Sequence, residues 1–321
     1  MRMQILIGAG GWSYFKLPKI MGDPLSWYAK AFNVVEVNST FYEIPSIKLA
    51  ESWRKRAPSN FEFTVKCHKS LTHDFKLELT NEAKKTLTQM IELCKTLKSK
   101  VLLIQTPSSV KPSRKNLEKA LKIAEIASTE NIEVAWEPRG EEWRSSEAKE
   151  LMKEFVEKSN GAHCVDISKN EPAAVSHFIY TRLFGKGKHN IYQFSSNEIA
   201  EIYSKIIGLS EKAERAYVIA HTKKMYIDAA RIKRYVETGK IPPATRNIGV
   251  EAVKEVLAED AKFPITRDEL IKVQGWKVIT WINFKDIKLA KILEKIPNKK
   301  YWSIDEVCKE INKIAIKFKY I

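Results

Sequence analysis

The sequence lacks the features that would place this protein in a membrane, in a secretory pathway or among zinc proteins. No stretch approaches the roughly 20 apolar residues that a membrane-spanning helix needs. The first residues contain a short apolar run but no small-residue cleavage site, so we interpret them as a first strand rather than a signal peptide. Four widely spaced cysteines form no Cys-x-x-Cys pair. This pattern gives no zinc signature and is typical of free thiols in the reducing cytoplasm.

Acidic residues are too few to balance the basic ones. The chain has 55 Lys and Arg against 39 Asp and Glu, a formal net charge of +16. Such a surplus favours polyanionic partners, namely nucleic acid, phosphorylated substrates or an anionic surface. The alternative is a solvated charged surface of the kind found in heat-adapted proteins. That alternative explains many charges of both signs, but it explains the surplus less well.

Short β-branched segments recur along the chain as far as residue 221, and segments of helical character separate them. Continuous apolar strands that alternate with helices are typical of parallel β/α architecture. Eight such units within about 240 residues match the usual span of a (β/α)8 TIM barrel, and an open doubly wound sheet is the alternative. The predicted strands are 4–8, 34–38, 61–67, 100–106, 132–137, 162–167, 178–184 and 215–221.

The glycines after the first predicted strand do not complete a dinucleotide-binding fingerprint. Gly8, Gly10 and Gly11 fall short of the G-x-G-x-x-G pattern. The segment that follows is aromatic and contains prolines, so no helix N-terminus stands there to hold a pyrophosphate. Glu36 lies near the distance expected of a ribose-binding acid, but without that helix we reject a Rossmann fold.

The β/α alternation stops at residue 242. The remaining sequence offers helical patterns around a short apolar run, and residues 266–276 and 301–311 each combine a capping residue, an acidic first turn and an apolar stripe. We therefore predict a TIM-barrel domain over residues 1–241 and a helical or winged-helix-like module over residues 242–321. This module would cover the barrel, bind nucleic acid or bind a protein partner.

Polar residues stand at the carboxyl ends of the predicted strands. In a barrel these ends face the mouth where substrates bind. Because an unpaired buried charge costs several kcal/mol, we expect these side chains to pair across a shared cavity. The set comprises Glu36, Asn38, Lys66, His68, Gln105, Glu137, Arg139, Asp166, Arg182 and His221.

Several of these residues also have a structural interpretation. Glu36 could form a buried ion pair with Lys66 or Arg182 instead of acting on a substrate. Asn38 could cap the following turn, and Gln105 could be a hydrogen-bonding wall residue.

Aromatic residues and two further histidines near the predicted mouth are open to the same alternative. Trp12, Tyr14 and Tyr42 could bind a substrate or simply pack. His73 could cap its own loop, and His163 could be a satisfied core histidine.

The loops after the seventh and eighth predicted strands are basic. Barrels often bind phosphate at these two positions. Gly185 and Gly187 would let backbone amides approach an anion, while Lys186, Lys188 and Lys223 would supply positive charge. The sequence therefore predicts a phosphate seat, with a solvated basic loop as the alternative.

Six motifs occur in order and together resemble the YecE-like family of TIM-barrel proteins, known as domain of unknown function 72. The resemblance covers roughly residues 5 to 240. It implies a TIM barrel with a polar mouth, related in shape to sugar isomerases and apurinic endonucleases, and it supplies no established reaction. The motifs are GWSY (11–14), FNVVEVNSTFYEIPS (32–46), FEFTVKCHKSLTH (61–73), LLIQTPSS (102–109), VAWEPRGEEW (134–143) and YTRLFG (180–185).

The chain departs from the family pattern in two places. The eighth strand usually ends in a pair of asparagines, where this chain has His221, Thr222 and Lys223. The module after residue 241 is not part of the usual domain. The positions that do match the family pattern are Trp12, Glu36, Asn38, Tyr42, Lys66, Gln105, Glu137, Arg139, Asp166 and Arg182.

The first functional hypothesis is an enzyme that acts on nucleic acid, such as a DNA repair endonuclease, glycosylase or lyase. In one mechanism a divalent metal (magnesium, manganese or zinc) activates water. Its ligands would be Glu36, Glu137, Asp166 and His221.

In a second mechanism Lys66, its pKa lowered by Arg139 and Arg182, forms a Schiff base with an abasic sugar. Two other hypotheses remain open. The protein could be an isomerase or hydrolase of a phosphorylated sugar, or it could bind nucleic acid without catalysis.

Overall fold

The computed structural model describes residues 3–15 and 22–315 of the chain. The chain divides into two compact units, one of residues 1–183 and 204–221, the other of residues 184–203 and 222–321. The second unit therefore combines the segment after the seventh strand with everything that follows the eighth. The predicted domain boundary at residue 241 stays a prediction.

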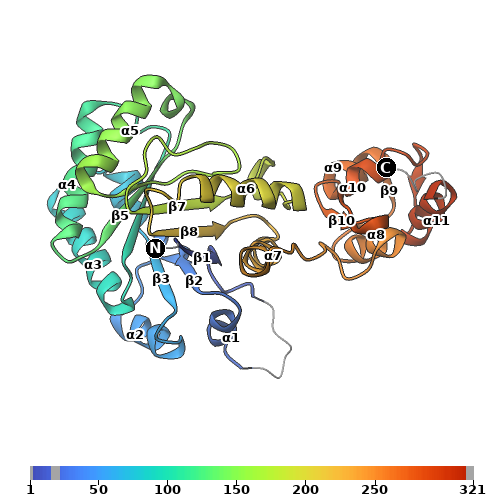
Figure 1. Cartoon of the computed structure of the whole chain (residues 1–321), viewed down its shortest axis with the longest axis horizontal. Coiled ribbons are helices and arrows are strands. Elements are labelled where there is room, and N and C mark those ends of the chain that lie inside the picture. Colours follow the sequence, from blue (N-terminus) through green and yellow to red (C-terminus); the bar gives the residue numbers. More distant parts are fainter. Residues whose placement is uncertain (1–2, 16–21, 316–321) are drawn as a thin grey trace. The chain divides into compact units, whose positions relative to one another are not determined.

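The first unit is built on eight parallel strands, as the sequence predicted. Their order in the sheet is β6-β5-β4-β3-β2-β1-β8-β7, so β1 to β6 lie side by side in sequence order, β7 pairs with β8, and β8 returns to β1 (Figure 1). This order is that of a TIM barrel and excludes the doubly wound alternative, in which strand order reverses part-way. The strands are β1 (Gln4–Ala9), β2 (Val34–Val37), β3 (Glu62–Lys66), β4 (Val101–Thr106), β5 (Glu133–Pro138), β6 (Ala162–His163), β7 (Phe178–Leu183) and β8 (Arg215–Ala220).

The barrel closes weakly between β6 and β7. A single parallel bridge joins Val165 to Thr181, and the Arg182 amide donates to Val165 O at 3.1 Å. The predicted strand 162–167 is wrong in extent, because β6 ends at His163. Beyond His163 only Val165 still pairs with β7, and at Asp166 the chain turns, with the Asp166 carboxylate accepting a hydrogen bond from the Ser168 amide at 3.1 Å.

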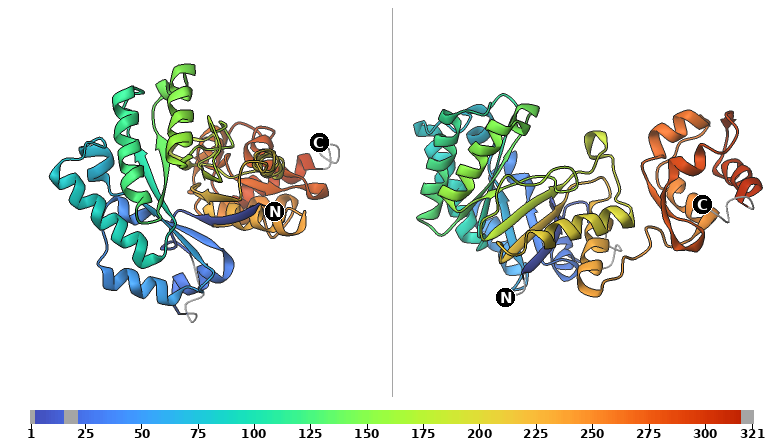
Figure 2. Two further views of the ribbon diagram at one scale, coloured as in Figure 1. Left: turned by 60° about the vertical axis from the view of Figure 1, so that its left-hand side comes forward. Right: turned by 45° about the horizontal axis from the view of Figure 1, so that its top comes forward.

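Helices cover the outer side of this sheet (Figures 1 and 2). Each of the first five begins at a side chain that accepts a hydrogen bond from a first-turn amide: Asp23, Ser46, Thr80, Ser113 and Ser145. Such caps fix where each helix starts after its loop. The helices are α1 (Pro24–Ala31), α2 (Ile47–Arg56), α3 (Asn81–Leu97), α4 (Arg114–Ser128), α5 (Ser146–Ser159) and α6 (Ser196–Gly208), and the short turn η3 (Glu141–Arg144) precedes α5.

The strands are buried on both faces, which explains their continuous apolar character. Every residue of β2 and of β7 is buried. Inside the barrel, Leu6, Val34, Leu103, Tyr180 and Ile219 belong to one packed cluster. Polar side chains among these strands must therefore find partners within the barrel.

Within its described residues the second unit contains the α-helices α7 to α11, the first part of α6 and two small antiparallel sheets. β10 pairs with β11 and β12 with β9, around a separate hydrophobic core that includes Leu270, Trp281 and Tyr301. The predicted capping residue is confirmed at Thr266, which forms a capping box with Glu269. The elements are η4 (Lys188–Asn190), α7 (Met225–Thr238), α8 (Gly249–Ala258), β9 (Ile265–Thr266), α9 (Arg267–Gln274), β10 (Val278–Thr280), η5 (Ile282–Phe284), β11 (Asp286–Lys288), α10 (Leu289–Leu293), β12 (Lys300–Tyr301) and α11 (Ile304–Ala315).

Buried polar contacts hold the two stretches of the second unit together. Arg231 on α7 forms an ion pair with Asp286 on β11 and donates to Phe194 O at 2.6 Å. Gln193 accepts a hydrogen bond from the Val278 amide at 2.9 Å. Residues 184–203 thus complete their hydrogen bonds with partners much later in the chain.

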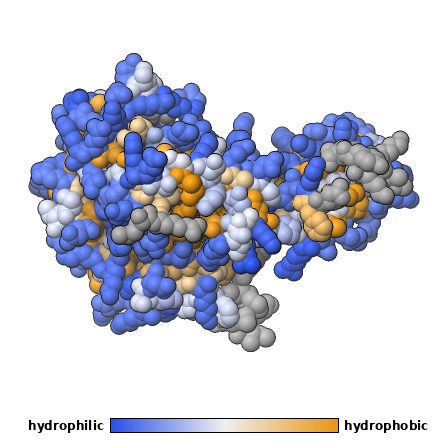
Figure 3. Space-filling view, viewed as in Figure 1, coloured by the Kyte–Doolittle hydropathy of each residue, from blue (hydrophilic) through white to orange (hydrophobic). Residues whose placement is uncertain are grey.

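The surface drawn in Figure 3 is mainly hydrophilic, in keeping with a chain in which 29% of residues are charged. The four cysteines are free and buried. Burial raises the pKa of the Cys67 thiol to about 12, so this thiol is inert at neutral pH.

Candidate active site

Arg182, near the end of β7, forms the centre of a buried ion-pair network. Its Nε and Nη2 donate to the two carboxylate oxygens of Glu36, each at 2.9 Å. Its Nη1 donates to Glu137 Oε2 at 2.5 Å. Bidentate arginine–carboxylate pairs fix geometry as well as charge. Of the two partners expected for Glu36 in a structural ion pair, Arg182 is therefore the one observed.

Glu137 extends the network across β4 and β5. Gln105 stands opposite Glu137 in the sheet register and donates to its Oε2 at 2.9 Å. Arg139 lies 2.6 Å from Glu137 Oε1, and its side chain is 44% exposed. The network therefore runs from the barrel interior to solvent at Arg139.

Two further rings complete the surroundings of Glu36. The Tyr180 hydroxyl donates to Glu36 Oε2 at 3.0 Å and lies 2.7 Å from Thr64 Oγ1. His221 Nε2 lies 3.1 Å from Glu36 Oε1. The departure from the family pattern at the end of the eighth strand is thus built into the centre of the network.

The glycines at the end of β1 leave room for close packing. A Cβ on residue 10 would lie 2.1 Å from His221 Cε1, and a Cβ on residue 8 would lie 1.9 Å from Val34 O. Both distances are far below van der Waals contact. These glycines therefore serve the barrel interior.

The charges of the network balance locally. Burial by itself would raise the pKa of Glu36, but Arg182, and then His221, hold it well below its usual range. Burial would lower the pKa of Arg182, but Glu36 and then Glu137 raise it instead. Burial, followed by Arg182, lowers the pKa of His221, which is therefore neutral at pH 7.

Lys66 ends β3 beside this network without an ion pair of its own. Its side chain is 6% exposed, and among the residues that the structure describes none hydrogen-bonds its ammonium group. Its Nζ lies 4.0 Å from the centre of the Phe41 ring. Burial and then Arg182 lower the pKa of Lys66 to about 8, although the nearby carboxylates oppose the shift. An amine with such a pKa is a competent nucleophile near neutral pH.

The turn η1 (Asn38–Phe41) follows β2 and contacts the carboxyl end of β3 through the side chain of Thr40. The buried Thr40 hydroxyl lies 2.6 Å from Val37 O and 2.5 Å from Lys66 O, so it fixes the two strand ends to each other. Asn38 Oδ1 lies 3.5 Å from Arg182 Nη2. This turn therefore sets the position of Phe41 beneath the Lys66 amine.

Two other predicted site residues hold loops. Asp166 accepts a hydrogen bond from the Ser168 hydroxyl at 2.6 Å. His68 Nδ1 lies 2.8 Å from Ser70 Oγ and its Nε2 lies 3.2 Å from Tyr42 O, so its two ring nitrogens join the loop after β3 to the end of the turn after β2.

The predicted substrate-binding aromatics differ in exposure. Trp12 packs edge-on against Trp53, with ring centres 5.1 Å apart. Tyr14 and Tyr42, in contrast, are 80% and 69% exposed. Trp12 therefore has a packing partner and the two tyrosines are accessible, and substrate binding by these three aromatic residues stays a prediction.

The glycines of the predicted phosphate loop have a packing role in the second unit. A Cβ on residue 185 would lie 2.2 Å from the Tyr192 ring, and a Cβ on residue 187 would lie 2.1 Å from Ile191 O. Gly185 also has a positive φ of 71°, which favours glycine. Close packing accounts for both glycines without a bound anion.

The predicted basic residues of these loops also lie in the second unit. Lys186 Nζ lies 3.8 Å from Glu198, and Lys223 Nζ lies 3.4 Å from Asp260. Lys188 begins η4. The phosphate seat stays a prediction.

The carboxylates predicted for a metal site are engaged with other groups. Glu36 and Glu137 both accept hydrogen bonds from Arg182. Over residues 3–15 and 22–315, no three His, Cys, Asp or Glu side chains are grouped as metal ligands. The predicted set of Glu36, Glu137, Asp166 and His221 is therefore not assembled in this part of the chain.

Sequence reasoning missed three members of the site. Tyr180 precedes Arg182 by two residues, and in a strand this spacing places both on one face, so a signal was present. Thr40 and Phe41 lie in a turn whose path no periodicity predicts.

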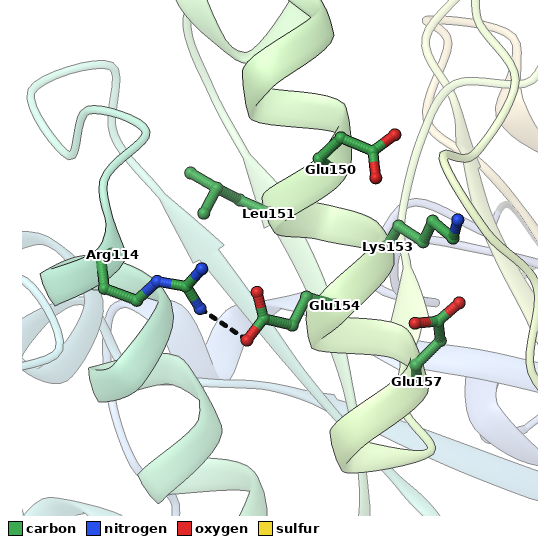
Figure 4. Close-up of a pocket in the computed structure, with 6 residues that line it drawn as sticks. All are labelled: Arg114, Glu150, Leu151, Lys153, Glu154 and Glu157. Carbon is green, nitrogen blue, oxygen red and sulfur yellow. Dashed lines mark hydrogen bonds and ion pairs between the residues drawn. The ribbon is translucent and has the colours of Figure 1, made fainter.

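A second, shallower feature lies on the outer side of the barrel between α4 and α5 (Figure 4). This cleft of about 280 Å³ is lined by Arg114, Leu151 and the charged residues of one face of α5. Arg114 and Glu154 form an ion pair at 2.5 Å across it. The cleft lacks a buried reactive group.

Similarity to known proteins lies mainly in the part of the chain that contains the barrel. Residues 6–246 match a family model described as protein of unknown function DUF72. The chain belongs to the DUF72 family. Residues 247–321 lie outside the match.

Relatives in the DUF72 family share the fold at low identity. A DUF72 family protein of Enterococcus faecalis V583 is 18% identical with a TM-score of 0.60, covering 74% of this chain and 98% of that protein. A DUF72 family protein of Thermotoga maritima MSB8 is 24% identical with a TM-score of 0.57, covering 73% and 99%.

A curated relative matches over a shorter stretch. The UPF0759 protein YecE of Escherichia coli K12 is 33% identical over 69 residues, which is 22% of this chain. The match spans 25% of that relative's length. Within the described part of the chain, no helix combines the length and apolar character needed to cross a membrane.

Proposed function

We propose that this DUF72 protein is an enzyme whose Lys66 amine attacks a carbonyl carbon of a phosphate-bearing substrate. The substrate that we favour is nucleic acid with an abasic sugar, which makes the protein a DNA repair lyase. A cytoplasmic location accords with four free, buried thiols.

The state of the Lys66 side chain is the observation that carries this proposal. A buried lysine ordinarily finds a carboxylate partner, because burial of an unpaired ammonium group is costly. Here the available carboxylates, Glu36 and Glu137, are bound by Arg182. The Lys66 amine is left with an aromatic neighbour and a pKa of about 8. Strongly perturbed groups of this kind cluster at functional sites.

The Arg182 network supports the same chemistry. Its guanidinium charge is held in place by two carboxylates and disfavours protonation of Lys66 without being able to exchange a proton itself. The carboxylates keep Arg182 fixed, so the field at the amine is preorganised.

The net charge of +16 favours a polyanion over a small neutral substrate. An abasic sugar in nucleic acid supplies both the required aldehyde and a phosphate backbone. A phosphorylated sugar would supply the same two groups, and it is the competing substrate class in the test.

The test is borohydride trapping of the imine between Lys66 and an oligonucleotide with one abasic site. We expect covalent capture by the native chain and none by Lys66→Ala. Lys69→Ala is the matched control, because Lys69 is exposed and lies three residues further along the chain. Native levels of capture by Lys66→Ala would rule the proposal out.

Two further arms separate the alternatives. Capture of glyceraldehyde phosphate but not of the abasic oligonucleotide would assign the enzyme to phosphorylated sugars. Binding to nucleic acid should weaken at least about tenfold between 50 and 200 mM salt if several phosphates are contacted. Salt-dependent binding without any capture would indicate a non-catalytic nucleic-acid-binding protein.

A further inference from the structure

The loop after β3 contains a π-helical turn, η2 (Ser70–Asp74), which begins four residues beyond Lys66. Such turns are rare and are frequent at functional sites. His73 lies in this turn, and its ring is half-buried. The turn therefore presents an imidazole close in sequence to the reactive amine.

His73 and Lys66 contact the same aromatic ring. The His73 ring packs edge-to-face against Phe41 with ring centres 4.9 Å apart, and Lys66 Nζ lies 4.0 Å from the centre of that ring. The separation of Nζ and the imidazole centre cannot exceed the sum of these two distances. A substrate bound covalently to Lys66 would thus lie within reach of His73.

One nitrogen of His73 is committed and the other is not. Nδ1 lies 2.9 Å from Thr72 Oγ1, and that hydroxyl lies 3.5 Å from His68 O. Because the Thr72 hydroxyl donates to His68 O, it accepts the hydrogen bond from His73 Nδ1. The proton of the neutral imidazole is therefore on Nδ1, and Nε2 carries a lone pair. Nothing within the described residues hydrogen-bonds Nε2.

The other bases near Lys66 are occupied. Glu36 and Glu137 accept hydrogen bonds from Arg182. His221 Nε2 lies 3.1 Å from Glu36 Oε1 and 3.2 Å from Arg182 Nε. Burial, followed by Lys66, lowers the pKa of His73, so its imidazole is neutral at pH 7.

We infer that His73 is the general base of the reaction, a role that rests on the proposed lyase function. Lys66 supplies the nucleophile, and Nε2 of His73 removes a proton from the carbon next to the imine. The substrate class is a sugar aldehyde with a phosphate ester on its β carbon, the carbon next to the one that loses the proton.

Lys66 Nζ adds as the free amine to C1′ of the open-chain aldehyde, and loss of water with uptake of one proton from solvent gives a protonated imine. His73 Nε2 takes the C2′ proton, and the electron pair of that bond moves toward the imine nitrogen to give an enamine. The enamine then expels the C3′ phosphate with its electron pair and forms a C2′–C3′ double bond. Water hydrolyses the remaining protonated imine, which releases the free Lys66 amine and one proton to solvent, and His73 returns its own proton to solvent.

The experiment separates imine formation from elimination, using the full chain and the abasic oligonucleotide. In His73→Ala and His73→Gln, we expect borohydride capture at Lys66 to stay close to the native level. Strand cleavage should fall about 100- to 10,000-fold, the usual contribution of a general base. Added imidazole should restore cleavage in His73→Ala, because the vacated space can accept it. His177→Gln is the histidine control, since His177 precedes β7 and lies at the opposite strand end.

Each contrary result has a distinct meaning. Absence of capture in the native chain overturns the proposed function itself. Capture with undiminished cleavage in both His73 variants overturns the role of His73 alone. Loss of capture together with cleavage in both variants would assign His73 to positioning Phe41 and would also overturn its role as a base.

Discussion

Arg182 and Glu36 form a bidentate ion pair inside the barrel, with both hydrogen bonds at 2.9 Å and both side chains almost wholly buried. The arginine comes from β7 and the glutamate from β2, so the pair spans the interior. Such a pair adds little to stability over an apolar equivalent, but loss of one partner is costly.

Replacement of Arg182 by Met should therefore destabilise the protein by about 3–5 kcal/mol at pH 7. In the native chain the pKa of Glu36 lies below its usual range, so its stabilising contribution is present above about pH 4.5 and is lost as pH falls further. Without Arg182, burial would raise the pKa of Glu36, and the variant should gain stability between pH 7 and pH 5. Urea unfolding at the two pH values measures this.

Arg139→Met is the control for that experiment. Like Arg182, Arg139 pairs with Glu137, but its side chain is 44% exposed. The loss of stability in Arg139→Met should therefore stay below about 1 kcal/mol. Equal losses in the two variants would contradict the distinction between buried and exposed pairs.

Replacement of Lys66 by Met should abolish imine capture and yet stabilise the folded chain at pH 7. The pKa of Lys66 is about 8 in the folded state against an ordinary 10.5, so charging this group in the barrel costs stability below pH 8. That cost disappears as pH rises from 8 to 10.5. We expect a gain in the free energy of unfolding of about 1–3 kcal/mol at pH 7.

Chemical denaturation at pH 7 and at pH 10 tests the Lys66 prediction, because the advantage of the variant should shrink at the higher pH. A variant that is less stable than the native chain at pH 7 would indicate that Lys66 has a structural partner.

Imine formation should follow the titration of Lys66. Since only the free amine attacks a carbonyl, the rate of borohydride capture should rise with pH and level off above about pH 8. A rise that continues toward pH 10 would show that Lys66 titrates as an ordinary lysine.

Gly10→Ala should displace His221, because the new Cβ would lie 2.1 Å from its ring. Overpacking of this kind costs about 1–3 kcal/mol. The double variant Gly10→Ala with His221→Ala should recover part of that loss, and thermal unfolding of the four chains gives the coupling. Additive losses would show that the clash lies elsewhere.

Asp228 makes a prediction about the second unit. Burial raises the pKa of Asp228 to about 7 although its oxygens accept hydrogen bonds from Thr222 and the Phe194 amide. Its raised pKa lowers stability as pH increases from about 4 to 7. The free energy of unfolding of Asp228→Asn, relative to that of the native chain, should therefore rise by about 2 kcal/mol between pH 5 and pH 8. A constant difference over this range would mean that Asp228 is ionised throughout.

Much of the first unit could be predicted from the sequence because its signals are local. The strands are rich in β-branched residues and are buried on both faces, so their composition predicts that they belong to a parallel sheet covered by helices. Polar residues at strand ends predicted Glu36, Glu137 and Arg182 as one site, because the carboxyl ends of parallel strands meet at one end of a barrel.

The remainder could not be predicted because it depends on contacts distant in the sequence. Phe41 approaches Lys66 through the path of η1, which the Thr40 hydroxyl fixes between two strand ends. The glycines after β7 resemble a phosphate loop, but Tyr192 and Ile191 occupy the space beside them. The partner of Arg231 lies on β11, which no local pattern connects to α7.

The discontinuous second unit also has a consequence for synthesis of the chain. Gln193 emerges from the ribosome 85 residues before Val278, and its side chain accepts a hydrogen bond from the Val278 amide. The segment after β7 therefore leaves the ribosome with unfilled hydrogen bonds, while β8, made in between, can already pair with β1. These contacts can form only after β10 and β11 have been synthesised, and a ribosome that stalls before β11 leaves Arg231 without the Asp286 carboxylate.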